Sequence, residues 1–416
     1  MLPGAFAPSL VADAARLGTW MPFNRIPAVL HGFVGTLLSE PTVRRLTEAA
    51  GAAYVDVQTA TLERLERSGE APPAGAAGNV LQISVDGAMV PLRGKGEWGE
   101  VKTLAVGAVT ATASGPATVD LSYFSRRADH ATFTRLATVE THRRGVETAG
   151  TVCGVVDGAD WCQSFLDVHR PDAVRILDFS HAAGYLSQVA QVAFGAGTRA
   201  AATWYEKQRH ALKHDSTPDK VLAAVRAVRD EVTERPVTAA DSAGATAIGK
   251  CLAYFEKRVD QLRYATFVAQ GYPTGSGIVE SANKLVVEYR LKGAGMHWAP
   301  EHVDPMVALR TAACANRWEE TWPQICAQLR QNHRASATER HNRRQARREA
   351  RSCASLITPS KAVAAPVGPP PPPVRATPKP PTREPLSFGP GRPAPNHPWK
   401  RRFLLPSRHN RIDAKL

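Results

Sequence analysis

The spacing of the apolar residues changes at one point in the chain, and this change limits the possible folds more than any other feature. Up to about residue 70 the apolar positions recur at helical spacing, and a Pro/Gly/Ala-rich link then covers Ala71–Gly78. Beyond the link, three runs alternate with a period of two and predict strands at Val80–Asp86, Val101–Ala113 and Ala117–Phe124. The chain should therefore fold as an α/β protein whose sheet follows a helical region.

The order of the later elements narrows the topology of this sheet. Ala131–Glu147 predicts a helix, and Gly150–Val156 and Ala173–Leu177 predict two short buried strands with a helix between them. Three strands, then a helix, a strand, a helix and a strand are the order of a ribonuclease-H-like mixed sheet. We therefore assign the chain to the α/β class, with residues 78–184 as the first part of a ribonuclease-H-like catalytic domain.

Two further segments complete the predicted catalytic part. Residues 185–270 show helical patterns throughout and no strand candidate, so they predict a large helical insertion. Residues 271–335 begin with a glycine-rich turn, continue into helices and predict the C-terminal part of the catalytic domain.

Residues 1–70 predict a small helical domain that resembles a helix-turn-helix. Arg25–Val34 and Glu40–Ala53 have suitable lengths and are joined by a short turn. In the second of these helices Arg44 and Arg45 point away from the apolar face, where a recognition helix would contact DNA phosphates. Two ordinary packed helices are an equally weighted alternative, because short turns between helices are common.

The positive charge of the chain is concentrated near one end. Residues 336–416 hold 17 Lys and Arg against four Asp and Glu, so they carry +13 of the formal net charge of +14. The same segment holds 16 of the 32 prolines. Such a composition buries too little apolar surface to offset its chain entropy, so we predict a disordered basic tail that attracts DNA without sequence preference.

Several classes of protein are disfavoured by what the sequence lacks. No apolar run approaches the roughly 18 residues of a membrane span, and the six cysteines form no C-x-x-C pair. Neither a dinucleotide fingerprint nor a P-loop is present. We therefore expect a cytoplasmic, nucleoid-associated bacterial protein with no membrane partner and no nucleotide cofactor.

Three carboxylates fall where a ribonuclease-H-like sheet would bring them together. Asp86 ends the first predicted strand, Asp157 follows the fourth, and Glu280 lies in the first turns of a late helix. Acidic oxygens of this kind can hold two Mg²⁺ ions about 3.5 to 4 Å apart, which suits phosphodiester cleavage. We predict that these three residues are catalytic and bind Mg²⁺ or Mn²⁺, although an Asp-Gly pair considered alone more often marks a turn.

A second acid competes with Asp157 for a place in this site. Asp178 ends the fifth predicted strand, and His181 follows three residues later. Asp178 could bind the metal while His181 handles protons, or Asp178 could simply cap the next helix. The spacing of the residues does not decide between Asp157 and Asp178.

Five motifs in a fixed order resemble those of a known family. They are Ser84-Val-Asp-Gly87, Val155-Val-Asp-Gly-Ala-Asp-Trp161, Ile176-Leu-Asp-Phe-Ser-His181, Gly275-Ser-Gly-Ile-Val-Glu280 and Arg290-Leu-Lys-Gly-Ala-Gly-Met-His-Trp298. Together they resemble the Kra-type group of bacterial insertion-sequence transposases, which are DDE enzymes related to the Mutator-like group. The resemblance covers roughly residues 10–325.

The resemblance implies a ranking of the acids and a set of DNA contacts. It implies that the second metal ligand is Asp157, and that Asp178 and His181 form a separate signature. It also implies that Arg290, Lys292 and Trp298 lie near bound DNA.

General chemistry suggests how these residues would contact DNA, and it leaves simpler alternatives. Arg290, Lys292 and Lys284 would contact phosphates. Trp298 would stack on an unpaired base. The alternatives are that Trp298 packs in the core and that Lys284 pairs with Glu280 one helical turn earlier.

The predicted activity is that of a DDE transposase. It would cleave double-stranded DNA at the terminal repeats of an insertion sequence and transfer the freed strand into target DNA, acting as a homodimer. The resemblance also implies a cysteine-rich segment before the helical region, which this sequence does not show. That difference favours the main alternative, a catalytically inactive or truncated remnant that only binds DNA; a nuclease without strand transfer is a further one.

Overall fold

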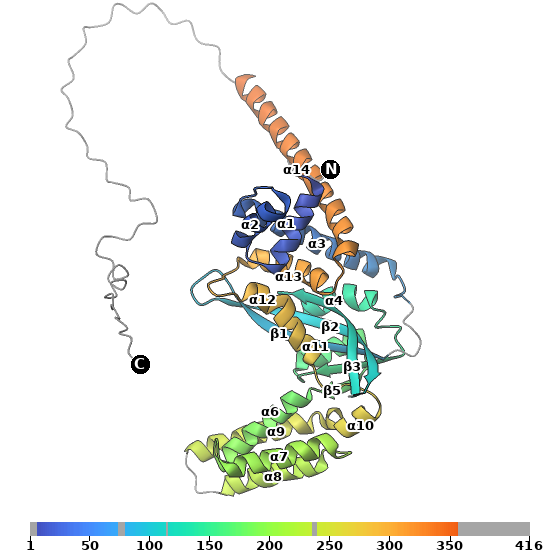
Figure 1. Ribbon diagram of the computed structural model, residues 1–416, viewed down its shortest axis with the longest axis vertical. Helices are drawn as coiled ribbons and strands as arrows, with labels where there is room; N and C mark the ends of the chain where they lie inside the picture. Colours follow the sequence, from blue (N-terminus) through green and yellow to red (C-terminus); the bar gives the residue numbers. More distant parts are fainter. Residues whose placement is uncertain (1–5, 74–79, 114, 235–238, 357–416) are drawn as a thin grey trace, which may run out of the picture. The chain divides into compact units, whose positions relative to one another are not determined.

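The computed structural model describes residues 6–73, 80–113, 115–234 and 239–356. The chain forms two compact units, Met1–Arg348 and Glu349–Leu416, and the fold described below is that of the first unit. Helices come first, a mixed five-stranded sheet follows, and further helices complete the unit (Figure 1). The predicted link Ala71–Gly78 lies partly outside the described residues.

The N-terminal region is helical, as predicted. It holds α1 (Pro8–Trp20), the short 3₁₀ helix η1 (Phe23–Arg25), α2 (Ile26–Val34) and α3 (Glu40–Ser68). Pro41 lies in the first turn of α3, where its missing N–H would have had no helical partner. The predicted pair of helices joined by a short turn is present, although α3 continues well past Ala53.

The sheet has the strand order β3-β2-β1-β4-β5. Its strands are β1 (Val80–Pro91), β2 (Trp98–Thr112), β3 (Gly115–Arg126), β4 (Thr151–Val156) and β5 (Val174–Leu177). β1, β2 and β3 pair antiparallel, whereas β1, β4 and β5 pair parallel, which confirms a mixed sheet. The predicted end of the first strand at Asp86 was wrong, because residues 87–91 continue to pair with β2.

The alternation of side chains along β1 assigns each residue to one face of the sheet. Leu81, Ile83 and Val85 pack in a core with α4 (His130–Arg143) and α5 (Asp160–His169). Ala88 and Val90 lie on the opposite face, in a core with the late helices. Asp86 has the same parity as Ala88, so its side chain lies on the face of the late helices.

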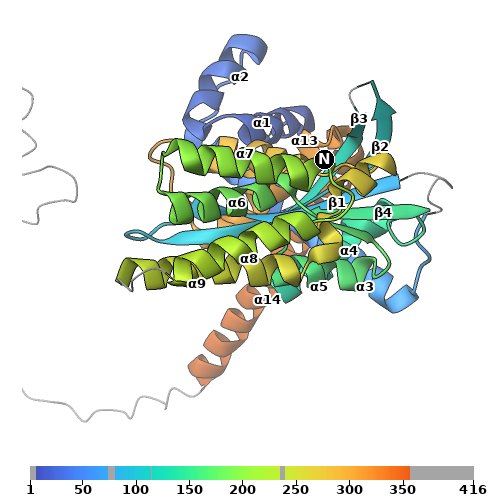
Figure 2. The same ribbon diagram turned by 90° about the horizontal axis from the view of Figure 1, so that it is seen from below.

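The described residues between Phe179 and Ala269 are mostly helical and pack against the β4 and β5 end of the sheet. They form α6 (Phe179–Phe194), α7 (Arg199–His214), α8 (Asp219–Glu234), α9 (Ala239–Glu256), η2 (Val259–Leu262) and α10 (Tyr264–Ala269). Their apolar side chains share one core with Val155, Ile176 and Leu177 of the strands. Figures 1 and 2 show α6 to α9 gathered as one group of helices, as the predicted helical insertion requires.

The late helices include a wide-turned segment that the sequence did not reveal. They are α11 (Gly277–Ala282), the π-helix η3 (Asn283–Glu288), α12 (Tyr289–Leu291), α13 (Pro300–Cys314) and α14 (Trp318–Leu356). The fully buried Arg310 of α13 donates to the carbonyls of Leu285 and Val286, which belong to the π-helix. Its third donor reaches the carbonyl of Thr19, 2.7 Å away. Arg310 therefore ties the first helix to the helix that follows Glu280.

The N-terminal helices share a core with α13 and α14. Ala50 and Tyr54 of α3 pack with Leu309 and Ala312 of α13 and with Ile325 of α14. The helices that we expected to form a separate small domain are thus built into the first unit.

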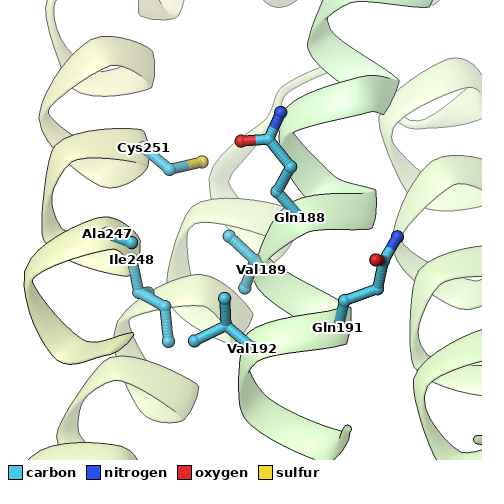
Figure 3. Close-up of a pocket in the computed structure, with 7 residues that line it drawn as sticks. All are labelled: Gln188, Val189, Gln191, Val192, Ala247, Ile248 and Cys251. Atoms are coloured by element: carbon cyan, nitrogen blue, oxygen red, sulfur yellow. The ribbon is translucent and has the colours of Figure 1, made fainter. Parts of the chain in front are cut away.

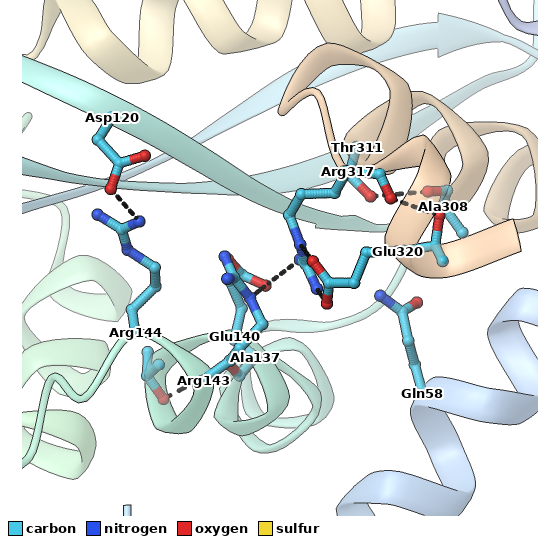
Figure 4. Close-up of polar contacts among 12 residues, drawn as sticks. Gln58, Asp120, Ala137, Glu140, Arg143, Arg144, Ala308, Thr311, Arg317 and Glu320 are labelled. Carbon is cyan, nitrogen blue, oxygen red and sulfur yellow. Dashed lines mark hydrogen bonds and ion pairs between the residues drawn. The ribbon is translucent and has the colours of Figure 1, made fainter. Parts of the chain in front are cut away.

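A buried polar network adds a second link between distant segments. Glu140 of α4 accepts from Arg143 at 2.5 Å and from Arg317 at 3.2 Å (Figure 4). Arg317 also pairs with Glu320 at 2.9 Å. Because Arg317 directly precedes α14, the network fixes the start of that helix against α4.

The structure corrects the prediction of a tail disordered from residue 336. α14 runs to Leu356, and the side chains from His333 to Ala350 are all exposed. Residues 357–416, which include all 16 prolines of the predicted tail, lie outside the described residues. Among the helices that the structure does describe, none is long and apolar enough to cross a membrane.

Candidate active site

The parallel pairing of β1 and β4 brings two of the predicted acids together. Ile83 pairs with Gly154, and continuing this register by three residues aligns Asp86 with Asp157. β4 ends at Val156, so β1 has a free edge at the level of Asp86. Because side chains alternate between the two faces of a sheet, the positions of Asp86 and Asp157 in this register place both on the same face.

The Asp86 carboxylate is half-buried, and the charges of the other two predicted acids act on it. Burial raises the pKa of Asp86, and the negative charges of Asp157 and Glu280 raise it further. Hydrogen bonds from the Gly87 N–H and from Asn283 act in the opposite direction. The Asn283 amide donates to Asp86 Oδ2 at 2.9 Å, so the π-helix that follows Glu280 contacts the first acid directly.

Asp157 is held by several partners that orient its side chain and backbone. Its Oδ1 accepts from the Ala159 N–H at 2.9 Å and from Cys162 Sγ at 3.4 Å. Burial and the nearby Asp157 charge raise the pKa of the Cys162 thiol, so it stays protonated and acts as a donor. The Tyr254 hydroxyl donates to the Asp157 carbonyl oxygen.

Glu280 is the exposed member of the three acids. It lies in the short helix α11, just before the π-helix, and no ion pair joins it to Lys284 in the described part of the chain. No three His, Cys, Asp or Glu side chains of the described residues stand close enough to hold a metal ion.

Asp178 has a different set of partners. It is buried, its Oδ2 accepts from the His181 backbone N–H at 2.7 Å, and its Oδ1 accepts from the Ser276 N–H at 2.7 Å. Asp178 therefore caps α6 and anchors the glycine-rich turn that leads to Glu280. These contacts match the capping interpretation and occupy both carboxylate oxygens.

His181 contributes its backbone to this cap, while its ring packs elsewhere. The exposed imidazole lies edge-on to Tyr185, with ring centroids 5.2 Å apart, and 6.3 Å from the ring of Tyr254. His181 thus lies beside the tyrosine that holds the Asp157 carbonyl.

Three of the predicted DNA contacts line one cavity. Arg44 of α3, Arg290 and Trp298 surround a space of about 670 Å³ between the N-terminal helices and the segment that leads into α13. Arg93, from the turn between β1 and β2, adds a further positive charge to the lining. The cavity is therefore rich in guanidinium groups, although Glu40 forms an ion pair with Arg44 there.

Arg290 and Trp298 lie beneath the surface of this cavity. Arg290 is 2% exposed, donates to the Gly18 carbonyl at 2.9 Å and packs against the rings of Phe23 and Trp298. Burial and the nearby charge of Arg310 lower its pKa to about 10, and its Nη2 has no partner among the described residues.

The Trp298 indole N–H donates to the Leu291 carbonyl at 3.1 Å, and the side chain is buried. Its backbone bonds to Pro91 and Arg93 beside the end of β1. Trp298 therefore packs in the core, as the alternative interpretation predicted, and its ring is not exposed for stacking on a base.

The remaining predicted DNA contacts lie at the surface. Arg45 and Lys284 are exposed, and Lys292 pairs with Glu288 at 2.6 Å. The structure therefore does not gather these three residues with the cavity that Arg44 lines.

A second cavity, of about 220 Å³, lies apart from the acids. It is formed by α6 and α9, and its lining carries no charged side chain (Figure 3). Its lining residues are Gln188, Val189, Gln191, Val192, Ala247, Ile248 and Cys251. It contributes nothing to the carboxylate site.

Four residues of the site escaped sequence reasoning: Asn283, Cys162, Tyr254 and Arg258. Asn283 follows Glu280 by three residues, so helical spacing could have suggested it. Cys162 comes five residues after Asp157, directly after its motif, but cysteines without a spaced partner gave no signal. Tyr254 and Arg258 come from a helical segment about 100 residues away, and no local pattern marks them.

No protein-family model matches the chain, and no curated protein matches it significantly in sequence.

Proposed function

We propose that this chain is a DDE-type transposase with a ribonuclease-H-like catalytic sheet. The observation that carries the proposal is the placement of the three acids: Asp86 in β1 is aligned with Asp157 after β4, and Asn283, which follows Glu280 of α11, donates to Asp86. The strand order, with an antiparallel β2 and parallel β1, β4 and β5, supports the same assignment.

The donor chemistry of this site suits Mg²⁺ or Mn²⁺. Carboxylate oxygens are the ligands that such hard cations prefer, and Asp86, Asp157 and Glu280 would provide them. A bound pair of divalent cations would activate the attacking oxygen and stabilise the leaving oxygen of a phosphodiester. Neutralising the repulsion that raises the pKa of Asp86 would favour binding of a cation here.

The chain's own residues would position the acids and the DNA. Asn283 holds Asp86, and Ala159 and Cys162 hold Asp157. Arg44 and Arg93 would contact DNA phosphates at the cavity, on the face of the sheet that carries Asp86. The exposed arginines of α14 would add attraction that does not depend on sequence.

The test is cleavage of a labelled DNA duplex that carries the inverted repeat flanking the coding gene. The purified full-length chain is incubated with this duplex and a target plasmid, with Mg²⁺, with Mn²⁺ and without metal. We expect metal-dependent nicking at the repeat end and joined products, both absent for Asp86→Ala and Asp157→Ala. Asp178→Asn reports the role of Asp178, and we expect it to alter stability more than cleavage.

The outcomes separate the alternatives. Binding of the repeat without cleavage in either metal would identify a DNA-binding remnant, for which the exposed basic helix α14 is the supporting observation. Cleavage without joined products and without preference for the repeat would identify a nuclease instead.

A further inference from the structure

We infer that Tyr254, in the last turn of α9, and Arg258, just after that helix, are positioning residues for Asp157. The inference rests on the proposed metal-binding role of Asp157 and deepens it. It assigns to the insertion a direct part in shaping the acidic site, which neither the motifs nor the spacing of the acids indicated.

Tyr254 holds the backbone of Asp157 itself. Its hydroxyl donates to the Asp157 carbonyl oxygen, and its ring packs at a tilt against Tyr185, with ring centroids 4.5 Å apart. Burial raises the pKa of the Tyr254 hydroxyl, so it remains a donor at all physiological pH values. The ring of Tyr254 is therefore held by packing, and its hydroxyl fixes the Asp157 backbone by a hydrogen bond.

Arg258 holds the residues that follow Asp157. Its guanidinium donates to the Gly158 carbonyl and lies 3.2 Å from Asp160 Oδ1. It also packs over the Tyr254 ring at 4.1 Å, and the side chain is 6% exposed. A buried guanidinium needs such partners, so the loop and Arg258 stabilise each other.

Gly158 is the residue that allows this close approach. A Cβ at this position would clash with the Tyr254 hydroxyl oxygen and would lie 2.9 Å from Arg258 Nε. Its φ of +82° is also one that side-chain-bearing residues rarely adopt. Asp157-Gly158 is thus more than a turn at a strand end, because it is the surface on which the insertion docks.

The consequence concerns the direction of the Asp157 carboxylate. The Ala159 N–H bonds to Asp157 Oδ1, so the position of the loop sets the position of the carboxylate. If the contacts of Tyr254 and Arg258 are lost, the loop after Asp157 should become more mobile. Asp157 would then no longer be fixed beside Asp86 in a position to bind a cation. Losing an outer partner of a metal ligand typically weakens metal binding about 10- to 100-fold.

The test compares two tyrosines of the same region in the full-length chain. Tyr254→Phe removes the hydroxyl that bonds to Asp157. Tyr264→Phe is the matched control, because the Tyr264 hydroxyl donates to the Leu177 carbonyl at 2.9 Å, at the end of the neighbouring strand. Arg258→Lys keeps a positive charge but loses the paired contacts to Gly158 and Asp160.

Two measurements are made on each variant. Mn²⁺ titration should show an affinity about 10-fold weaker for Tyr254→Phe and Arg258→Lys, and within about 2-fold of the unmodified chain for Tyr264→Phe. Hydrogen exchange, followed by mass spectrometry without metal, should be faster over residues 157–162 for the first two variants only. Melting temperatures should fall equally for the two tyrosine variants.

Either of two results would overturn the inference: unchanged exchange over residues 157–162 in Tyr254→Phe, or the same change in Tyr264→Phe. Failure of the proposed function gives a different pattern. In that case Asp86→Asn and the unmodified chain would bind Mn²⁺ equally, whereas the exchange comparison, which uses no metal, would still test the positioning role.

Discussion

When Asp86 is charged, as the proposed metal binding requires, we expect it to lower the stability of the folded chain. Its pKa is raised by burial and by two neighbouring acids, so the folded state holds a proton on Asp86 more strongly than the unfolded state does. Stability should then fall as pH rises above the ordinary value of 3.8. We expect Asp86→Asn to raise Tm at pH 7 and to have little effect at pH 3, as measured by thermal unfolding. A lower Tm at pH 7 would contradict this.

His169, which lies away from the carboxylate site, should make the stability of the fold depend on pH in the opposite direction. Its ring lies buried between the Thr141 hydroxyl, 3.1 Å away, and the Thr134 carbonyl, 3.0 Å away. Burial lowers its pKa to about 4, so the stability it supports is complete above 6.5 and is lost as pH falls from 6.5 to about 4.

The full loss would be roughly 3 kcal/mol, from about 1.4 kcal/mol for each unit of pKa shift. Urea unfolding at several pH values would measure it. The control is His169→Gln, which cannot titrate and should show a flatter pH dependence between 6.5 and 4. Identical slopes for the two proteins would remove His169 as the cause.

At the level of single residues, the sequence indicated the acids better than their partners. Asp86 and Asp157 could be found because the period-two pattern and the Asp-Gly pairs mark them; Asp157 directly follows β4 as predicted, whereas Asp86 lies within β1 rather than at its end. Asn283 and Tyr254 could not be found in the same way. Their roles depend on which helix faces the strand, and that is decided by packing across the sheet rather than by local pattern.

Comparing Gly158, in the loop after β4, with Gly271 separates two costs of adding a side chain: backbone strain and steric crowding. Gly158 and Gly271 have nearly the same φ, +82° and +81°, but a Cβ would meet close neighbours only at Gly158. We expect Gly271→Ala to lower the free energy of unfolding by about 1 to 2 kcal/mol through strain alone. Gly158→Ala should lower it by a further 1 to 3 kcal/mol through crowding. Denaturant unfolding of both variants measures the difference, and equal losses would mean that the loop can shift freely.

The helix α14 makes a prediction about DNA binding. Arg340, Arg344 and Arg347 are exposed on it, and each phosphate contact contributes about 0.9 to the slope of log affinity against log salt. Replacing all three with Gln should reduce the magnitude of that slope by up to roughly 3, measured by fluorescence anisotropy on a short duplex. The control triple, Arg209, Arg226 and Arg229 of the helical insertion, already pairs with acids. If both triples lower the slope alike, the effect is one of net charge alone.

At the scale of elements, both differences between sequence and structure have a local cause. β1 continues beyond Asp86 because Met89, Val90 and Pro91 still pair with β2, although Asp-Gly usually marks a turn. α14 extends into the segment expected to be disordered because residues 336–356 contain no proline. They are rich in Arg and Ala, which favour helices, and the first proline of the predicted tail comes at Pro359.

The core shared by α3, α13 and α14 predicts how the whole first unit unfolds. Leu309 is fully buried in that core, so Leu309→Ala should cost about 2 to 5 kcal/mol. Residues 40–68 and 80–112 should then lose hydrogen-exchange protection together, because no separate N-terminal domain would hold the helices. Protection kept in the strands after it is lost in α3 would contradict a single cooperative unit.

The sequence could not have predicted this arrangement of the whole unit. The Pro/Gly/Ala-rich link before β1 is a normal sign of a domain boundary, and residues 1–70 look self-contained in their pattern. Their apolar faces are nevertheless completed by residues beyond 300, and periodicity gives the face of a helix but not its partner. Arg310 shows the same limit, since its bonds to Thr19 and to the π-helix follow from the fold alone.

The partnership of α3 with α13 and α14 has a consequence for synthesis of the chain. Ribosomes add roughly 5 to 20 residues per second, so α3 emerges on the order of 10 to 50 s before Leu309 and Ile325 exist to cover it. During that interval the nascent helix exposes an apolar face that a chaperone could bind. Translation that stops before α13 would yield the sheet and its acids but leave α3 uncovered. Completion of the folded site would therefore wait for almost the entire first unit to be translated.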